Sequence, residues 1–346
     1  MKTHLLTREE VTLDRLKGLV LCHDLLNETG QSVLKKGQIL QEEDLPLLQS
    51  LPWEELHLVE MEEGDLHEDE AGARLAPAVA GEGVEVKGLA GGQWPLAARW
   101  KGILDVDVER LRRVNRIEGI SVYTLYRGHI VVEGELVARA KITPFVLQED
   151  KVREAEAIAH EVGGLLRVRP FMKRQVAAVV QETLDEKNHE RFRSAFHEKV
   201  AWFGSELLDI VFVPPTPEAI AGALQALVKK GAQVIVTAGA RAMDPLDPAF
   251  RALERAGASL EKHGVPAHPG SLFWLAFLEQ VPIIGMPSCS LFSKATVFDL
   301  VLPRILSGGR ISREELSELG HGGFLTRELA FRFPPYRPTK GRGELE

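Results

Sequence analysis

Short apolar runs alternate with longer amphipathic stretches in the second half of the chain. The apolar runs have the length and β-branched content of buried strands, and they lie at 175–181, 207–213, 231–239 and 281–287. The stretches that follow them have helical spacing, at 190–204, 216–231, 245–257 and 293–306. Thr216 and Pro217 supply an N-cap and a first-turn proline for the second helix. This alternation predicts an α/β domain with a doubly wound parallel sheet over residues 174–310.

The first half has shorter elements and a mixed α+β pattern. Residues 1–60 contain a strand-like run, a turn and a helical stretch, which predict a small α+β unit. Residues 61–150 begin with an acidic, Ala-rich helix start and continue with alternating strands that turn at Glu133–Gly134. We expect a linking helix within residues 151–173, and a charged, Pro-rich C-terminal tail over 311–346 that frays.

Length, charge and cysteine content exclude several kinds of protein and binding site. A length of 346 residues predicts two or three domains. The formal net charge of −8 disfavours a nucleic-acid partner, because phosphate binding needs clustered Lys and Arg. Cys22 and Cys289 cannot build a disulfide framework, a thiolate zinc cage or an iron–sulfur site within one chain. No run resembles a signal peptide or has the length to span a bilayer, so we expect a cytoplasmic protein without a membrane partner.

Two loops carry the residues with candidate chemistry. In an open parallel sheet, ligands bind beyond the carboxyl ends of strands, near a switch in strand order. One loop follows the third apolar run and the other follows the fourth. Small residues let backbone N–H groups approach an anion at one end of a ligand. Asp244 and Asp247 offer carboxylates that accept paired hydrogen bonds from a guanidine-like group at its other end. The candidate ligand-binding residues in these loops are Thr237, Ala238, Gly239, Ala240, Arg241, Gly285, Pro287, Ser288, Cys289 and Ser290.

The same residues have a structural interpretation, which spacing alone favours. Gly and Pro shape turns in any α/β fold, and Asp244 or Asp247 caps the helix that follows. Cys289 fits a small buried residue at a turn, and Arg241 fits either an exposed loop cation or a ligand of a terminal phosphate. His263 has no ligand-like spacing to another histidine, so we expect a structural or surface role.

The order of five segments is more specific than any single loop. TAGARAMDPLD, RAGA, GVPAHPG, PIIGMPSCS and KATVFDLVLPRIL follow one another between residues 237 and 306. This order resembles the molybdopterin-binding domain family, which molybdopterin adenylyltransferases and MoeA-type molybdenum-insertion proteins share. The resemblance covers residues 174–310, the length of a domain.

Individual residues match three motifs of that family. The matching positions are Thr237, Gly239 and Asp247 in the first motif, Pro269 and Gly270 in the second, and Gly285–Ser290 in the third. The N-terminal segments LHEDEAGARLA, VNRIEGISVYTL and VARAKITP, with the late GHGGFL, resemble a narrower group. That group consists of stand-alone bacterial molybdopterin-binding proteins with a MoeA-like architecture.

The resemblance implies a molybdopterin-binding protein of molybdenum-cofactor biosynthesis. If it is an enzyme, the reaction resembles insertion of molybdenum into adenylylated molybdopterin. Asp247 and Asp244 are then the catalytic residues, and Asp247 is the candidate ligand for Mg²⁺. The resemblance also implies a homodimer that meets other molybdenum-cofactor proteins.

Several positions depart from the family pattern. Ala238 and Ala240 stand where glycine is common, which limits close approach of the backbone to a phosphate. Ser288–Ser290 replaces Gly-Asn-Pro, and Ser271 stands where MoeA-type proteins carry a lysine. Glu182 alone corresponds to an acidic stretch near the first strand. These departures favour an alternative, a non-catalytic molybdopterin carrier or sensor. A further alternative is a nucleotide or pyrophosphate hydrolase-like enzyme, since related domains are fused to such activities.

Overall fold

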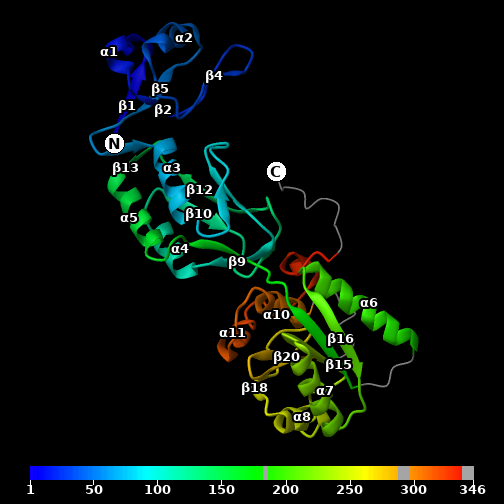
Figure 1. Ribbon diagram of the computed structural model, residues 1–346. Helices are drawn as coiled ribbons and strands as arrows, with labels where there is room; N and C mark the ends of the chain where they lie inside the picture. Colours follow the sequence, from blue (N-terminus) through cyan, green and yellow to red (C-terminus); the bar gives the residue numbers. More distant parts are fainter. Residues whose placement is uncertain (182–185, 287–295, 337–346) are drawn as a thin grey trace. The chain divides into compact units, whose positions relative to one another are not determined.

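A computed structural model describes residues 1–181, 186–286 and 296–336, and the chain divides in it into two units (Figure 1). Unit 1 consists of Met1–Trp100, Leu104–Arg127 and Val131–Val168. Unit 2 consists of Lys101–Ile103, Gly128–Ile130 and Arg169–Glu346. Each unit has its own apolar core. No helix in the described ranges is long and apolar enough to cross a membrane.

The first sixty residues of unit 1 form a small lobe, drawn in dark blue in Figure 1. Its antiparallel sheet has the order β1 (Lys2–Thr7), β5 (Glu55–Glu60), β2 (Val20–Leu21), beside a hairpin of β3 (Leu25–Leu26) and β4 (Ser32–Leu34). The helical segments are η1 (Arg8–Glu10), α1 (Leu13–Leu16), η2 (Glu42–Asp44) and α2 (Leu45–Ser50). Leucines fill a separate core, among them Leu21, Leu48 and Leu56. Residues 1–60 thus combine short strands with helical turns around their own core.

The remainder of unit 1 packs three helices with short sheets, one of which includes residues that belong to unit 2. The helices are α3 (Glu68–Val79), α4 (Val108–Asn115) and α5 (Glu149–His160). The largest sheet has the order β10 (Ile120–Thr124), β12 (Leu136–Ile142), β8 (Trp94–Ala98), β7 (Val84–Val86). The smaller sheets are β13 (Val146–Gln148) with β6 (Asp65–His67), and the order β11 (Ile130–Val131), β9 (Gly102–Val106), β14 (Leu166–Pro170). Helix α5, expected as a link, instead buries Val152, Ala155 and Ile158 in this core.

Unit 2 is built on a six-stranded mixed sheet. Four strands are parallel, in the order β16 (Glu206–Phe212), β15 (Gln175–Val180), β17 (Val234–Ala238), β20 (Val281–Met286). Beyond β20 the sheet continues with β19 (Trp274–Leu278) and β18 (Ser259–His263), which are antiparallel. The expected all-parallel sheet is therefore wrong for these last two strands. The turn between β19 and β20 is too short for a parallel crossover, which needs a dozen or more residues.

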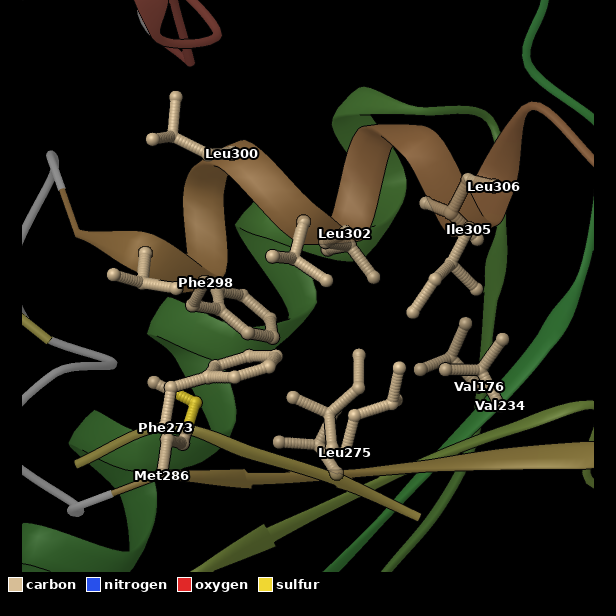
Figure 2. Close-up of a cluster of buried hydrophobic side chains, with 14 of the residues drawn as sticks. Val176, Val234, Phe273, Leu275, Met286, Phe298, Leu300, Leu302, Ile305 and Leu306 are labelled. Atoms are coloured by element: carbon tan, nitrogen blue, oxygen red, sulfur yellow. The ribbon is translucent and has the colours of Figure 1, made fainter. Parts of the chain in front are cut away.

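Helices cover both faces of this sheet. Side chains alternate along β15, so Val176, Ala178 and Val180 face α6 (Glu186–Trp202) and α10 (Val297–Leu306). Ala177 and Val179 face α7 (Pro217–Lys230) and α8 (Pro248–Ala256). Figure 2 shows α10 above the sheet, with Phe298 toward Phe273 and Met286, and with Ile305 and Leu306 above Val176 and Val234. The predicted N-cap of α7 is confirmed, because Thr216 accepts from the N–H of Ala219.

The segment after α10 belongs to the same core. It contains α11 (Arg313–Glu318) and η3 (Arg327–Arg332). The buried side chains of Leu316, Leu319, Leu325 and Phe333 join the cluster on the α10 face of the sheet. Residues 311–336, expected as part of a fraying tail, therefore pack into unit 2.

Candidate functional site

The strand order places a topological switch point between β15 and β17. The chain leaves β15 through α6 to β16 on one side, and returns through α7 to β17 on the other side. In open α/β sheets the crevice outside the carboxyl ends of the strands at such a point is the usual ligand position. We call the edge of the unit 2 sheet at the carboxyl ends of β15, β17 and β20 the carboxyl edge.

Asp247 organises the loop at the carboxyl edge. Its Oδ1 accepts from the N–H of Ala249 at 2.9 Å and from Nε2 of Gln181 at 3.2 Å. Its Oδ2 accepts from the N–H of Arg241 at 2.8 Å. The residue is 3% exposed and is the N-cap of α8. The carboxylate thus joins the end of β15, the loop after β17 and the start of α8.

The loop itself presents donors and a cation. Gly239, at φ 94°, turns the chain out of β17 in the left-handed region, which glycine favours. Ala240 and Ala242 are buried, and their N–H groups donate to no acceptor among the described residues. The side chain of Arg241 is exposed. Unpaired N–H groups beside an arginine form a region that an anion can occupy.

Asp244 has a local role in this loop. Its Oδ1 accepts from the N–H of Leu246 at 2.9 Å, and its own N–H donates to the carbonyl of Arg241 at 2.8 Å. The side chain is exposed, as are those of Met243 and Leu246. Of the two predicted acidic residues, Asp244 is thus the one that solvent reaches.

The second predicted motif lies at the same edge. Strand registers pair His263 with Trp274 and Trp274 with Gly285, so the connection 264–273 emerges beside the end of β20. The Nε2 atom of His263 lies 2.6 Å from the carbonyl oxygen of Ala242 and thereby holds the loop. The structure therefore brings the first and second motifs together.

Pro269 and Gly270 contact the start of α10. The N–H of Val297 donates to the carbonyl of Pro269 at 3.2 Å. A Cβ added at Gly270, whose φ is 114°, would lie 2.9 Å from the nitrogen of Val297. The carbonyl of Ser271 accepts a hydrogen bond from the N–H of Val265, and the side chain of Ser271 is exposed. Gly270 thus permits close packing of this connection against a helix N-terminus.

Other predicted residues lie inside strands. Thr237 and Ala238 are buried in β17, and the Thr237 hydroxyl donates to the carbonyl of Ile284. Gly285 lies under the indole of Trp274, where an added Cβ would be 1.7 Å from a ring carbon. The side chains of Thr237 and Ala238, and the absence of one at Gly285, contribute to packing within the sheet. The remaining candidates, Glu182, Pro287, Ser288, Cys289 and Ser290, lie outside the described residues.

Sequence reasoning missed a buried polar network next to α10. Lys199 Nζ donates to Asp299 Oδ1 at 2.6 Å, and the Tyr336 hydroxyl donates to the same oxygen at 2.6 Å. Asp299 Oδ2 accepts from the N–H and hydroxyl of Thr296 at 3.0 and 3.1 Å. Burial raises the pKa of the Tyr336 phenol well above its usual value, and the negative charge of Asp299 raises it further. The phenol therefore stays protonated and donates its hydrogen bond. The network fixes the N-terminus of α10.

The described residues do not build a resident Mg²⁺ site. The Asp247 carboxylate already accepts three N–H donors in a buried position. No group of three or more His, Cys, Asp or Glu side chains among the described residues is arranged to hold a metal ion. Mg²⁺ favours several oxygen ligands, which the described residues of this loop do not offer.

Comparison with known proteins gives a partial match in sequence. Residues 10–60 match a family described as a domain of unknown function (DUF8806). No curated protein matches the chain. The family match covers the small lobe of unit 1 and leaves unit 2 outside it.

Similar solved structures include molybdenum-cofactor biosynthesis proteins. One is the molybdopterin biosynthesis MoeA protein from Pyrococcus horikosii, at 15% identity and TM-score 0.29, covering 69% of this chain and 78% of that one. Another is a putative molybdenum cofactor biosynthesis protein from Corynebacterium diphtheriae, at 17% identity and TM-score 0.26, covering 44% and 100%. A third is MogA, at 15% identity and TM-score 0.24, covering 38% and 90%. Because these TM-scores are below 0.5, the likenesses carry no argument for fold or function.

Proposed function

We propose that the chain binds molybdopterin, or a close phosphorylated pterin, at the carboxyl edge of unit 2. The observation that supports this proposal most directly is the position of two segments. Residues 237–247 and 264–273, which resemble motifs of the molybdopterin-binding family, lie at one edge of the sheet beside its switch point. The N–H groups of Ala240 and Ala242 with Arg241 supply the phosphate end of the site. Asp244, whose carboxylate is exposed, supplies an acceptor for the guanidine-like edge of the pterin.

Asp247 supports this proposal as a positioning residue. Its three hydrogen bonds fix the loop geometry that an anion would meet. A carboxylate with three N–H donors and 3% exposure is poorly placed to take a proton from a substrate. This arrangement favours a carrier or sensor over a molybdenum-insertion enzyme, in agreement with the departures from the family pattern.

A turnover assay with the full chain separates the candidate functions. Adenylylated molybdopterin is incubated with the protein, with and without molybdate and Mg²⁺, and nucleotide products are measured. A carrier retains the pterin without turnover. Molybdate-dependent release of AMP would identify an insertion enzyme. Hydrolysis of the phosphoanhydride to AMP and free molybdopterin without molybdate would identify a hydrolase. Absence of pterin binding in every condition would contradict the proposal itself.

A further inference from the structure

The small lobe of unit 1 contains a groove that the pterin site does not use. It has a volume of about 490 Å³ and is lined by His23, Asp24, Leu25, Leu26, Pro52, Trp53, Glu54 and Glu55. The lobe has a leucine core of its own and is the segment that matches a separate family. A groove on such a lobe therefore belongs to a distinct module of the chain.

The groove arises where two strands separate. Strand β2 pairs with β5 only at Val20–Val59 and Leu21–Leu58, and the N–H of Cys22 then donates to the carbonyl of His57. After Cys22 the chain turns away into the hairpin of β3 and β4. The Glu55 end of β5 has a ladder partner in β1, and none on the β2 side among the described residues. An extended peptide can add main-chain hydrogen bonds at such an open edge.

The groove has an apolar floor. The indole nitrogen of Trp53 donates to the carbonyl of Leu48 at 2.7 Å, which fixes the orientation of the ring. Leu26 is 44% exposed and Pro52 is exposed. A fixed indole beside an exposed leucine is typical of the anchoring positions of an interface.

The rim of the groove is acidic. Among the described residues, Asp24 and Glu54 form no ion pair with a lysine or arginine, and Glu55 pairs only with the exposed His57, at 4.0 Å, when that imidazole is protonated. Arg8 lies over the Trp53 ring and donates to the backbone carbonyls of Gln49 and Leu51. His23 does not offset the charge of the carboxylates. Burial lowers the pKa of its imidazole, the neighbouring His57 lowers it further, and the ring is therefore neutral near pH 7. A cationic partner would supply complementary charge to this rim.

We propose that this groove binds an extended peptide segment of a partner protein in which lysine or arginine alternates with leucine-type side chains. The peptide backbone pairs with the open edge of β5, its apolar side chains contact Trp53 and Leu26, and its cations meet Asp24, Glu54 and Glu55. The interaction is independent of the pterin site in unit 2, so failure of either proposal leaves the other standing.

Fluorescence anisotropy of a labelled peptide of alternating Leu and Arg, added to the full chain, tests this assignment. We expect saturable binding that weakens about tenfold in the double variant Glu54→Gln/Glu55→Gln and falls with added salt. The variant Leu26→Ala should weaken binding several-fold. The control Glu9→Gln/Glu43→Gln removes two exposed carboxylates of the same lobe that do not line the groove, and should leave binding unchanged.

Three results would overturn the proposal. The first is no binding of the Leu/Arg peptide at millimolar concentration. The second is equal binding of a Ser/Arg peptide, because the groove would then act only as a diffuse negative charge. The third is a concentration-dependent dimer in sedimentation velocity that Leu26→Ala abolishes, because the occupant would then be a second copy of the chain.

Discussion

The side-chain amide of Gln181 donates to the carboxylate of Asp247 at 3.2 Å and thereby links the end of β15 to the N-cap of α8, beyond the loop that follows β17. These two strands flank the switch point of the unit 2 sheet. The bond is buried, and its acceptor also caps α8 and fixes the N–H of Arg241. One carboxylate therefore determines the shape of the loop in which the pterin site is proposed.

Replacement of Asp247 by alanine should destabilise unit 2. The change removes a helix cap and leaves the N–H of Arg241 and the amide of Gln181 without their acceptor, which costs about 2–4 kcal/mol. Gln181→Ala removes one neutral donor and should cost about 1 kcal/mol. Urea unfolding followed by circular dichroism measures both. A loss below about 0.5 kcal/mol for Asp247→Ala would show that the three bonds contribute little.

Lys199→Met should destabilise unit 2 more than any change in the loop. Asp299 is fully buried, and loss of its ammonium partner leaves an uncompensated charge, which costs about 3–5 kcal/mol. Tyr336→Phe removes one of the four donors and should cost about 1–2 kcal/mol. The double variant Lys199→Met/Asp299→Asn should recover part of the loss. Equal destabilisation by the single and double variants would contradict this assignment of the cost.

Gly285→Ala should disrupt the contact between β20 and β19. An added methyl group would overlap the Trp274 ring at 1.7 Å, and overpacking of this kind costs about 1–3 kcal/mol or more. Gly285→Ala/Trp274→Leu places a smaller side chain opposite the methyl group and should be more stable than Gly285→Ala. Thermal unfolding of the three proteins provides the test. If the double variant were the less stable one, steric overlap would not be the cause.

Acid should weaken the clamp between α3 and α5 in unit 1. Arg74 donates to Glu149 at 2.7 Å and to Glu156 at 2.9 and 2.7 Å, and these bonds lower the pKa values of both carboxyls. Their contribution to stability is therefore present above the unfolded pKa, about 4.5, and is lost as pH falls through the lower folded values. We expect Arg74→Gln to reduce the dependence of unfolding free energy on pH between about pH 5 and pH 3. An unchanged dependence would argue against the clamp.

Sequence periodicity predicted the parallel part of unit 2 well and the antiparallel edge poorly. The runs that became β15, β16, β17 and β20 are apolar, bounded by polar turns and separated by helical spacing. Strand β19 is also apolar, but the turn after it has Glu279 at φ 56°, where glycine or asparagine usually signals a positive φ. Without that signal, the sequence gives no reason to place an antiparallel pair beside β20.

The sequence indicates the segments of the candidate site, but it does not indicate the contacts between them. The family-like order located the loop after β17 and the connection at Pro269–Gly270, since both depend on local sequence. The pairs Gln181–Asp247 and Lys199–Asp299 are 66 and 100 residues apart, and no local pattern connects their members. A helix cap is the structural interpretation that spacing favours for Asp247, and the structure shows this cap.

Binding of molybdopterin to the full chain tests the central claim most directly. Titration calorimetry compares the wild type with Asp247→Ala, and with Ser312→Ala, which removes the side-chain cap of α11 elsewhere in unit 2. The account predicts saturable binding to the wild type, a loss of at least about tenfold in affinity for Asp247→Ala, and no change for Ser312→Ala. Absence of binding to the wild type, or equal affinity of the wild type and Asp247→Ala, would contradict it.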